Sequence, residues 1–211
     1  MPRKPAEQTV QPDAILKAAA TVFYRKGYHG ATMAEIAAEV HLTAGSLYHH
    51  FPSKEDLLCA VLDHGLTQIT RSVRAVVNSA DPPAEKLRAI VQIHVLSEIE
   101  HVNIAAAVIF EGRALLEMPG VRDQYVRQRD TLEGLYRQVV EEGIAAGDFR
   151  PVDVGIFVKT LFGALNWVSL WYREGGRLSG REIADEIAGT FLAALRPLPA
   201  DDIPTQDGFD G

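Results

Sequence analysis

The chain has 211 residues and lacks several features that would define other classes of protein. Its single cysteine, Cys59, excludes an internal disulfide and any zinc module built from several cysteines. No unbroken run of about 18 apolar residues occurs, which argues against a membrane-spanning helix. With 21 basic and 28 acidic residues the formal net charge is −7, so the whole chain is not a polycation that coats nucleic acid. These absences predict a cytoplasmic protein without a membrane partner.

Strand-type alternation is also missing, and helical periodicity takes its place. Apolar residues, 47% of the chain, recur three and four positions apart between prolines and glycines. We therefore expect an all-α fold of about nine helices. Their predicted ranges are 12–26, 33–40, 44–50, 54–79, 83–100, 102–117, 120–146, 152–174 and 180–195.

Some of the predicted helix ends carry a chemical signature. Thr32 and Glu35 have the spacing of a capping box, in which each side chain bonds the other residue's backbone N–H. Ser53 stands in a similar position before the helix that follows it. Gly27 and Gly147 suit the left-handed conformation that ends many helices.

The chain changes character along its length. Residues 1–12 predict a flexible arm, and residues 13–64 predict short helices joined by tight turns. Residues 65–196 predict longer helices that form a larger domain. Residues 197–211 contain four Asp, three Pro and two Gly, so we expect a disordered acidic tail.

Residues 32–51 have the pattern of a helix-turn-helix. Ile36 and Ala37 form an apolar stripe on the first helix, Leu42 fills the turn, and Leu47 points inward from the second helix. The outer face and leading end of this second helix are then polar or small and suit a DNA major groove: Thr43, Ala44, Gly45, Ser46, Tyr48 and His49. A three-helix unit without a DNA function needs the same small residue and filled turn, so the crossing geometry alone leaves both interpretations open.

The choice between these two interpretations depends on a nearly continuous series of residues, which aligns without an insertion or deletion: 13–19, Phe23, 27–37 and 43–58. This series resembles the N-terminal domain of the TetR family of bacterial transcriptional regulators. The resemblance implies a DNA-binding domain with its recognition helix at 44–50, and a larger helical domain that binds a small effector and dimerises through its last two helices. Family members are mostly repressors that a ligand releases from DNA.

The resemblance also implies individual roles. It implies phosphate contacts from Thr32, Thr43, Tyr48 and Lys54, and base-edge positions at Ala44, Ser46 and His49. It places Leu47 and Phe51 in the core and His50 in half-buried support of the helix. Residues 1–64 depart from a basic DNA-binding domain, because six Lys and Arg face seven Asp and Glu. We therefore expect few phosphate contacts and a shallow salt dependence of DNA binding.

The segment 162–179 resembles one branch of the same family, together with residues 117–120 and Tyr136. That branch includes regulators of fatty-acid, branched-acid and sterol degradation, several of which respond to acyl-CoA thioesters. Two tryptophans four residues apart offer a flat stacking surface with polar neighbours. The predicted effector residues are Tyr125, Arg129, Asn166, Trp167, Trp171 and Arg173. An aromatic stripe in a core or dimer interface, or a free hydrophobic or aromatic effector, remains open.

Two apolar stripes near the C-terminus predict a four-helix homodimer interface. A dimer would present two recognition helices about 34 Å apart, so its operator should be nearly palindromic. The predicted interface residues are Phe157, Leu161, Leu165, Ile183, Ile187, Phe191 and Leu195.

Other function classes have weaker support. His94, Glu98 and His101 have a helical spacing that could hold a metal ion, but a fourth ligand is not evident, and we expect no metal and no cofactor. Cys59 fits a small core residue better than a redox sensor. Glu111, Arg113 and Glu117 form a polar group, yet no nucleophile elbow, phosphate-binding glycine loop or metal triad indicates an enzyme. A helical adaptor without a DNA function remains a third alternative.

Overall fold

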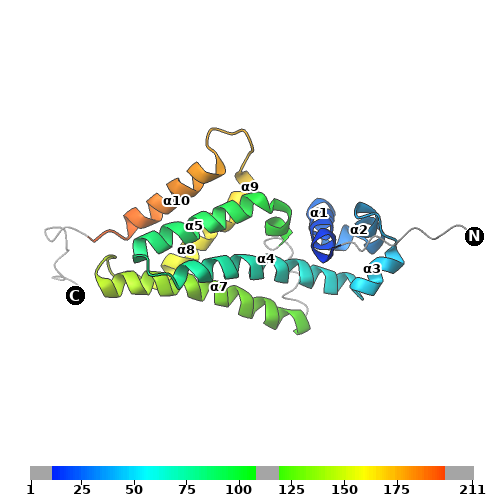
Figure 1. The fold of residues 1–211 in the computed structure, drawn as a ribbon, viewed down its shortest axis with the longest axis horizontal. Helices are drawn as coiled ribbons and strands as arrows, with labels where there is room; N and C mark the ends of the chain where they lie inside the picture. Colours follow the sequence, from blue (N-terminus) through cyan, green and yellow to red (C-terminus); the bar gives the residue numbers. More distant parts are fainter. Residues whose placement is uncertain (1–10, 108–118, 198–211) are drawn as a thin grey trace, which may run out of the picture. The chain divides into compact units, whose positions relative to one another are not determined.

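The computed structural model describes residues 11–107 and 119–197, and every regular element in these ranges is a helix (Figure 1). The all-α prediction is confirmed. Most of the predicted arm and of the acidic tail lies outside the described residues, which include only residues 11 and 12 of the arm and residue 197 of the tail. The predicted helix 102–117 is described over 102–107, and its residues 108–117 lie outside the described residues. The helices are α1 (Pro12–Gly30), α2 (Met33–Glu39), α3 (Ala44–His50), α4 (Lys54–Val77), α5 (Pro83–Glu100), α7 (Pro119–Ala146), α8 (Val154–Asn166), α9 (Val168–Trp171) and α10 (Gly180–Ala194).

Two of the fully described helices differ from their predicted ranges by more than two residues. Helix α1 continues to Gly30 across a kink at Gly27, whose φ of 68° is the left-handed conformation expected there. The predicted helix 152–174 is split, because α8 ends at Asn166 and α9 ends at Trp171. At the break, the Asn166 side chain bonds inward and the Ser169 hydroxyl donates to the Asn166 carbonyl at 3.2 Å. These side-chain bonds are not visible in the periodicity of the sequence.

The described helices form two compact units that differ from the predicted division at residue 64. Unit 1 contains residues up to 70 together with 97–130, and unit 2 contains residues 71–96 together with those from 131 onward. Helices α4, α5 and α7 each continue from one unit into the other. The reason lies in the core of unit 1, where Ile104 and Ala107 are buried with the side chains of α1–α4 and Tyr125 packs against them.

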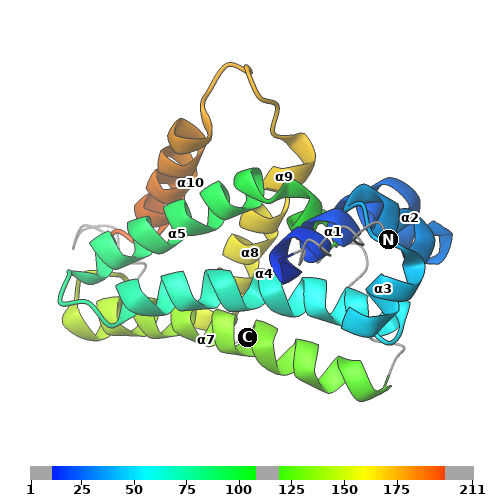
Figure 2. The same cartoon turned by 45° about the vertical axis from the view of Figure 1, so that its right-hand side comes forward.

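In unit 1, helices α1, α2 and α3 surround the first turns of α4 (Figure 2). Phe23, Ile36 and Leu58 are almost completely buried at the centre of its core. Side-chain hydrogen bonds attach the later segments to this core, since the Asn103 amide donates to the Thr21 hydroxyl at 2.9 Å. Gln124 and Gln128 of α7 both donate to Asp63 of α4. Unit 1 is therefore completed by residues that lie far along the sequence.

Unit 2 has a mostly apolar core with a polar centre at His94 of α5, which is almost completely buried. The two ring nitrogens of His94 lie 2.9 Å from the Tyr136 hydroxyl and 3.1 Å from Asn166 Oδ1. The Phe162 ring packs edge-on against the imidazole, with 5.4 Å between centroids. This polar centre joins α5, α7 and α8 within a mostly apolar interior, which also holds the buried side chains of Lys86 and Ser169.

Burial of His94 makes the stability of the fold sensitive to acid. Desolvation lowers the pKa of His94 to about 4, and the hydrogen bond with Asn166 offsets only part of that effect. Between about pH 6.5 and 4 the unfolded chain binds a proton that the folded chain does not, so stability falls as the pH falls through this range. Urea unfolding should show that His94 contributes a loss of about 2–3 kcal/mol between pH 7.5 and 4.5.

The control for this prediction is His94→Gln, which removes the titrating group and keeps hydrogen-bonding atoms. Carboxylates will add their own acid sensitivity in both proteins, so the comparison is between the two slopes of unfolding free energy against pH. Equal slopes for the parent chain and His94→Gln would contradict the prediction.

Replacement by alanine should have opposite effects on stability at two glycines of α7. A Cβ on Gly143 would overlap the buried ring of Phe149, which folds back after Gly147 and donates its N–H to the Gly143 carbonyl at 3.0 Å. A Cβ on the exposed Gly134 would meet nothing within 4 Å. Gly143→Ala should therefore lower the free energy of unfolding by about 2–3 kcal/mol or more. Gly134→Ala should raise it by up to about 1 kcal/mol, which chemical denaturation of both variants will test.

Candidate nucleic-acid interface and effector region

The helix-turn-helix is built from one capping box and one tight turn. Thr32 Oγ1 accepts from the Glu35 N–H at 3.3 Å, and the Thr32 N–H donates to the Glu35 carboxylate at 3.1 Å, so the predicted capping box is confirmed. The turn after α2 places His41 at a φ of 57° and directs the Leu42 N–H to the Ala37 carbonyl at 2.8 Å. Ala37 is fully buried, which lets α2 approach its neighbours closely.

Helix α3 is held by one buried side chain and exposes the rest of its surface. Leu47 is completely buried, and Thr43 caps the helix by accepting the Ser46 N–H at 3.1 Å. On the outer surface Thr43, Gly45, Tyr48, His49 and His50 are exposed, while Ala44 and Ser46 are partly buried. His50 is thus exposed and not half-buried as the resemblance implied. The outward face has the small and hydrogen-bonding character that a major groove requires.

Lys54 has an internal role that sequence reasoning missed. Its Nζ donates to the carbonyls of Tyr28 and Ala31, at 2.6 and 2.9 Å, and lies 4.5 Å from the centroid of the Tyr28 ring. The ammonium group therefore ties the start of α4 to the end of α1. A phosphate contact from Lys54 stays a prediction, and it would have to share the ammonium with these two carbonyls.

Two cations of α1 are paired with acids of α2. Arg25 pairs with Glu39, and Lys26 pairs with Glu35, both between α1 and α2. Hydrogen bonds from Lys26 and Thr32 hold the pKa of the Glu35 carboxyl below its usual range. These two pairs reduce the positive charge that α1 offers to DNA, which favours the shallow salt dependence expected from the sequence. Lys17 of the same helix is exposed and forms no ion pair with a described residue.

The predicted effector residues are divided between the two units. Tyr125 and Arg129 belong to unit 1, where Tyr125 packs on the core and Arg129 pairs with Asp130 at 3.1 Å. The remaining four belong to unit 2, and they point in different directions. Asn166 bonds inward to His94, whereas the other three are exposed: Trp167, Trp171 and Arg173.

Part of the predicted dimer interface is corrected by the structure. Leu161, Leu165 and Leu195 are completely buried within their own chain, and Ile183 is nearly so, because these large apolar side chains fill the core of unit 2. Buried side chains cannot meet a partner subunit. The other three predicted interface residues are partly buried: Phe157, Ile187 and Phe191. The rings of Phe157 and Phe191 pack edge-on, with 5.6 Å between their centroids.

A different stripe of α8 is exposed and was missed from the sequence. Ile156, Thr160, Gly163 and Trp167 lie along it, with 64% of Ile156 and 55% of Trp167 exposed. The stretch Val154–Trp171 is long and apolar enough to cross a membrane by length and composition, yet only 28% of it is buried in the chain. The argument from unbroken apolar runs overlooked it, because polar residues interrupt the stretch. Its small residues, such as Gly163, were the available signal of a surface that a neighbouring helix can approach.

Metal and thiol chemistry have no support in the part of the chain that the structure describes. No group of three or more His, Cys, Asp or Glu side chains there could hold a metal ion, and His94 is engaged in the polar centre. Burial raises the pKa of the Cys59 thiol to about 11, with Asp56 and Glu55 adding to the effect. A protonated, partly buried thiol suits packing better than redox sensing.

Comparison with known proteins gives two matches to family models. Residues 15–61 match "Bacterial regulatory proteins, tetR family", and residues 80–195 match "Tetracyclin repressor-like, C-terminal domain". The second range alone covers more than half of the chain.

Individual relatives agree with these models. The transcriptional repressor KstR2 of Mycolicibacterium smegmatis is 30% identical over 198 residues, which span 92% of this chain and 95% of the relative. The transcriptional activator FasR of the same species is 28% identical over 156 residues, 74% of this chain and 71% of the relative. A crystal structure of AibR in complex with isovaleryl coenzyme A and operator DNA is 28% identical, with a TM-score of 0.76, and the match covers 84% of this chain and 96% of that one.

Proposed function

Because this chain belongs to the TetR family of bacterial transcriptional regulators, we propose that it is a homodimeric repressor that an acyl-CoA thioester releases from a nearly palindromic operator. The family consists of regulators and not of enzymes, which removes the enzyme alternative. A DNA-binding regulator acts where the bacterial chromosome is, so we propose a cytoplasmic location.

The exposed face of α3 is the observation that carries the DNA-binding part of this proposal. Leu47 anchors the helix, and hydrogen-bonding side chains such as Tyr48 and His49 point to solvent. A short helix held in this way can enter a major groove without unfolding any part of unit 1. The proposed contacts are those that the sequence indicated: Thr32, Thr43, Ala44, Gly45, Ser46, Tyr48, His49 and Lys54.

A second copy of the chain is the partner that we propose for the exposed stripe of α8. An apolar helix that is mostly uncovered needs another apolar surface, and a nearly palindromic operator needs two identical DNA-binding units. Phe157, Ile187 and Phe191 border this surface and remain proposed interface residues. This proposal places Trp167 and Trp171 in the dimer interface and not in the effector site. The sequence analysis left that role open as the alternative for the two tryptophans.

The effector class is proposed from the relatives and from the interior of unit 2. AibR has been crystallised with isovaleryl coenzyme A and operator DNA. In this chain, the interior of unit 2 is mostly apolar, as an acyl chain requires, and we place the acyl end of a thioester there, beside the polar centre that His94 forms with Tyr136 and Asn166. Asn166 is then the one predicted effector residue that points into this interior. A free hydrophobic compound is the alternative effector, and it would need no site for phosphates.

A mobility-shift assay with DNA from upstream of the protein's own gene tests the proposal. The dimer should retard this DNA at low salt, and a suitable CoA thioester should reverse the retardation. The matching free acid and free coenzyme A, added separately, should not. If the thioester strengthens the retardation, the ligand promotes DNA binding and does not release the protein from DNA, which would contradict the proposed release mechanism. A folded dimer that retards no upstream DNA would exclude regulation at that site.

A further inference from the structure

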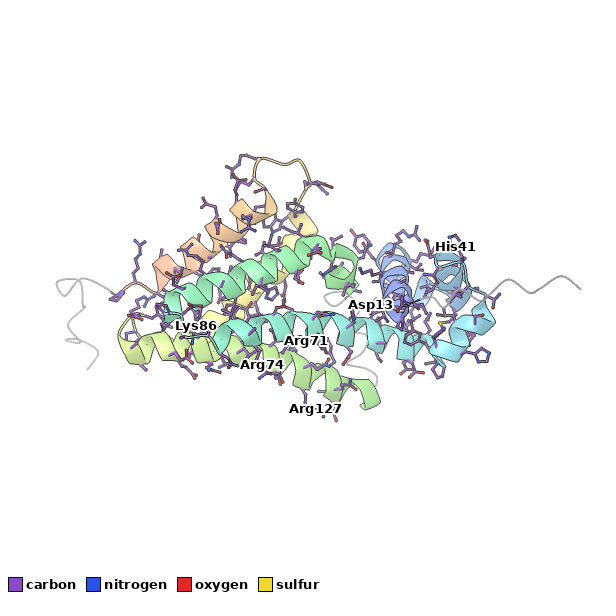
Figure 3. The ribbon with its side chains drawn as sticks, viewed as in Figure 1. Asp13, His41, Arg71, Arg74, Lys86 and Arg127 are labelled. Carbon is purple, nitrogen blue, oxygen red and sulfur yellow. The ribbon has the colours of Figure 1, made fainter. Side chains whose placement is uncertain are left out.

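We propose that Arg71 and Arg74 of α4 form a binding site for the phosphate groups of the effector. The two side chains are exposed and three residues apart, so they lie on the same face of α4. In Figure 3 both lie along the edge of α4 that is nearest to α7. The biological role of this site rests on the proposed function, whereas its chemistry rests on the charges around it.

These two arginines have no counter-ion among the described residues, although the chain is acidic overall. In unit 2 the other cations near α7 are already engaged: Lys86 pairs with Glu142 at 3.0 Å, and Arg137 and Lys159 both pair with Glu133. No ion pair or side-chain hydrogen bond joins Arg71 or Arg74 to another described group, and no Asp or Glu occurs anywhere in residues 64–80.

Two carboxylates of α7, Glu133 and Glu142, are already engaged with other groups. Hydrogen bonds from Gln138 and Lys86 hold the pKa of the Glu142 carboxyl low, and Glu133 is shared between two cations. Each of these acids would have to leave a partner in order to reach α4. The positive charge on this edge of α4 is therefore available to an anion from solution.

Phosphate is the anion that this arrangement suits best. A guanidinium group donates two parallel N–H bonds to a phosphate, and two such groups one turn apart can hold the several oxygens of a diphosphate. A single carboxylate would bind only one of the two guanidinium groups. The coenzyme A part of an acyl-CoA carries phosphate groups of this kind, whereas a free fatty or aromatic acid does not.

The position of the site suggests how a ligand would act on DNA binding. Helix α4 begins at Lys54, beside the helix-turn-helix, and continues without interruption to Val77. Unit 1 ends at Thr70 on this helix, so Arg71 and Arg74 occupy the first turn of α4 that belongs to unit 2. An anion bound there contacts the same continuous helix whose first turns belong to unit 1, and it shifts the DNA affinity only if the DNA-bound and the released states bind it with different affinities.

Calorimetric titration of the full-length dimer tests the site, with isovaleryl-CoA, coenzyme A and pyrophosphate as probes. The double variant Arg71→Gln with Arg74→Gln should bind isovaleryl-CoA about tenfold more weakly or worse. Arg88→Gln, on the exposed surface of α5, is the matched control and should bind like the parent chain. Replacement of both arginines by Lys keeps the charge but loses the paired N–H geometry, so it should give an intermediate affinity.

Different outcomes separate this site from the proposed function. Equal thioester affinity in the double glutamine variant and the parent would overturn the site, as would a parent chain that binds none of the three probes. A parent chain that binds coenzyme A or pyrophosphate through the two arginines, but whose operator complex ignores every thioester, would support the site and contradict the proposed effector. Weaker operator binding by the double variant without any ligand would assign the arginines to DNA phosphates instead and overturn the proposal.

Discussion

A Tyr48→Ala variant should lose about 100-fold or more in operator affinity while it unfolds at the same temperature as the parent chain. Tyr48 is 50% exposed on the outer face of α3, so its removal leaves no cavity in the core of unit 1. Loss of one good DNA contact costs about 1–3 kcal/mol, and a dimer loses it in both half-sites. Fluorescence anisotropy with labelled operator DNA will measure the affinity.

Tyr24→Ala provides a matched control for this variant. Tyr24 is 51% exposed in the same unit, but it lies on α1 and outside the proposed DNA contacts. Its replacement removes the same chemical groups from the same kind of surface, so operator affinity should change by less than about threefold. Equal losses for the two variants would mean that the tyrosine on α3 has no special place in recognition.

A Gly163→Glu variant should be monomeric at micromolar concentration and should bind the operator at least about 100-fold more weakly. Gly163 is exposed on α8, and a Cβ there would meet nothing within 4 Å, so the glutamate fits the single chain. In the proposed dimer it would place a charge in an apolar interface. A monomer holds only one half-site and loses the effective concentration that the second half-site provides.

Gly134→Glu is the control for the dimer prediction. Gly134 is also an exposed helical glycine with no atom within 4 Å of an added Cβ, but it lies on α7. Both variants gain the helix propensity that glycine lacks, so any difference between them reflects the surface and not the folding of the chain. Light scattering that finds the Gly163→Glu variant still dimeric would remove the α8 stripe from the interface.

Features of the fold that depend on neighbours in the sequence could be predicted well. The capping box of Thr32 and Glu35 and the left-handed Gly27 both form within a few residues, and each was visible as a short pattern. The bounds of α2, α3 and α5 follow from the same local signals. The exposed face of α3 could be predicted because Leu47 is the apolar residue that fixes the orientation of a short helix.

Features that depend on distant residues could not be predicted in the same way. Ile104 and Tyr125 join the core of unit 1 from far along the chain, and no local pattern shows which core an apolar residue will enter. The same ambiguity put Leu161 and Leu165 at the dimer interface, because a buried stripe and an interface stripe have the same periodicity. Lys54 was assigned to phosphate alone, since its carbonyl acceptors become neighbours only when α1 and α4 meet.

Footprinting of the dimer on its operator tests the central claim most directly. Two copies of α3 should protect two symmetric half-sites whose centres lie about 34 Å apart, one turn of the duplex, and an acyl-CoA thioester should abolish both regions of protection together. Protection of one half-site alone, or no protection at low salt by a folded dimer, would contradict the account of a paired regulator.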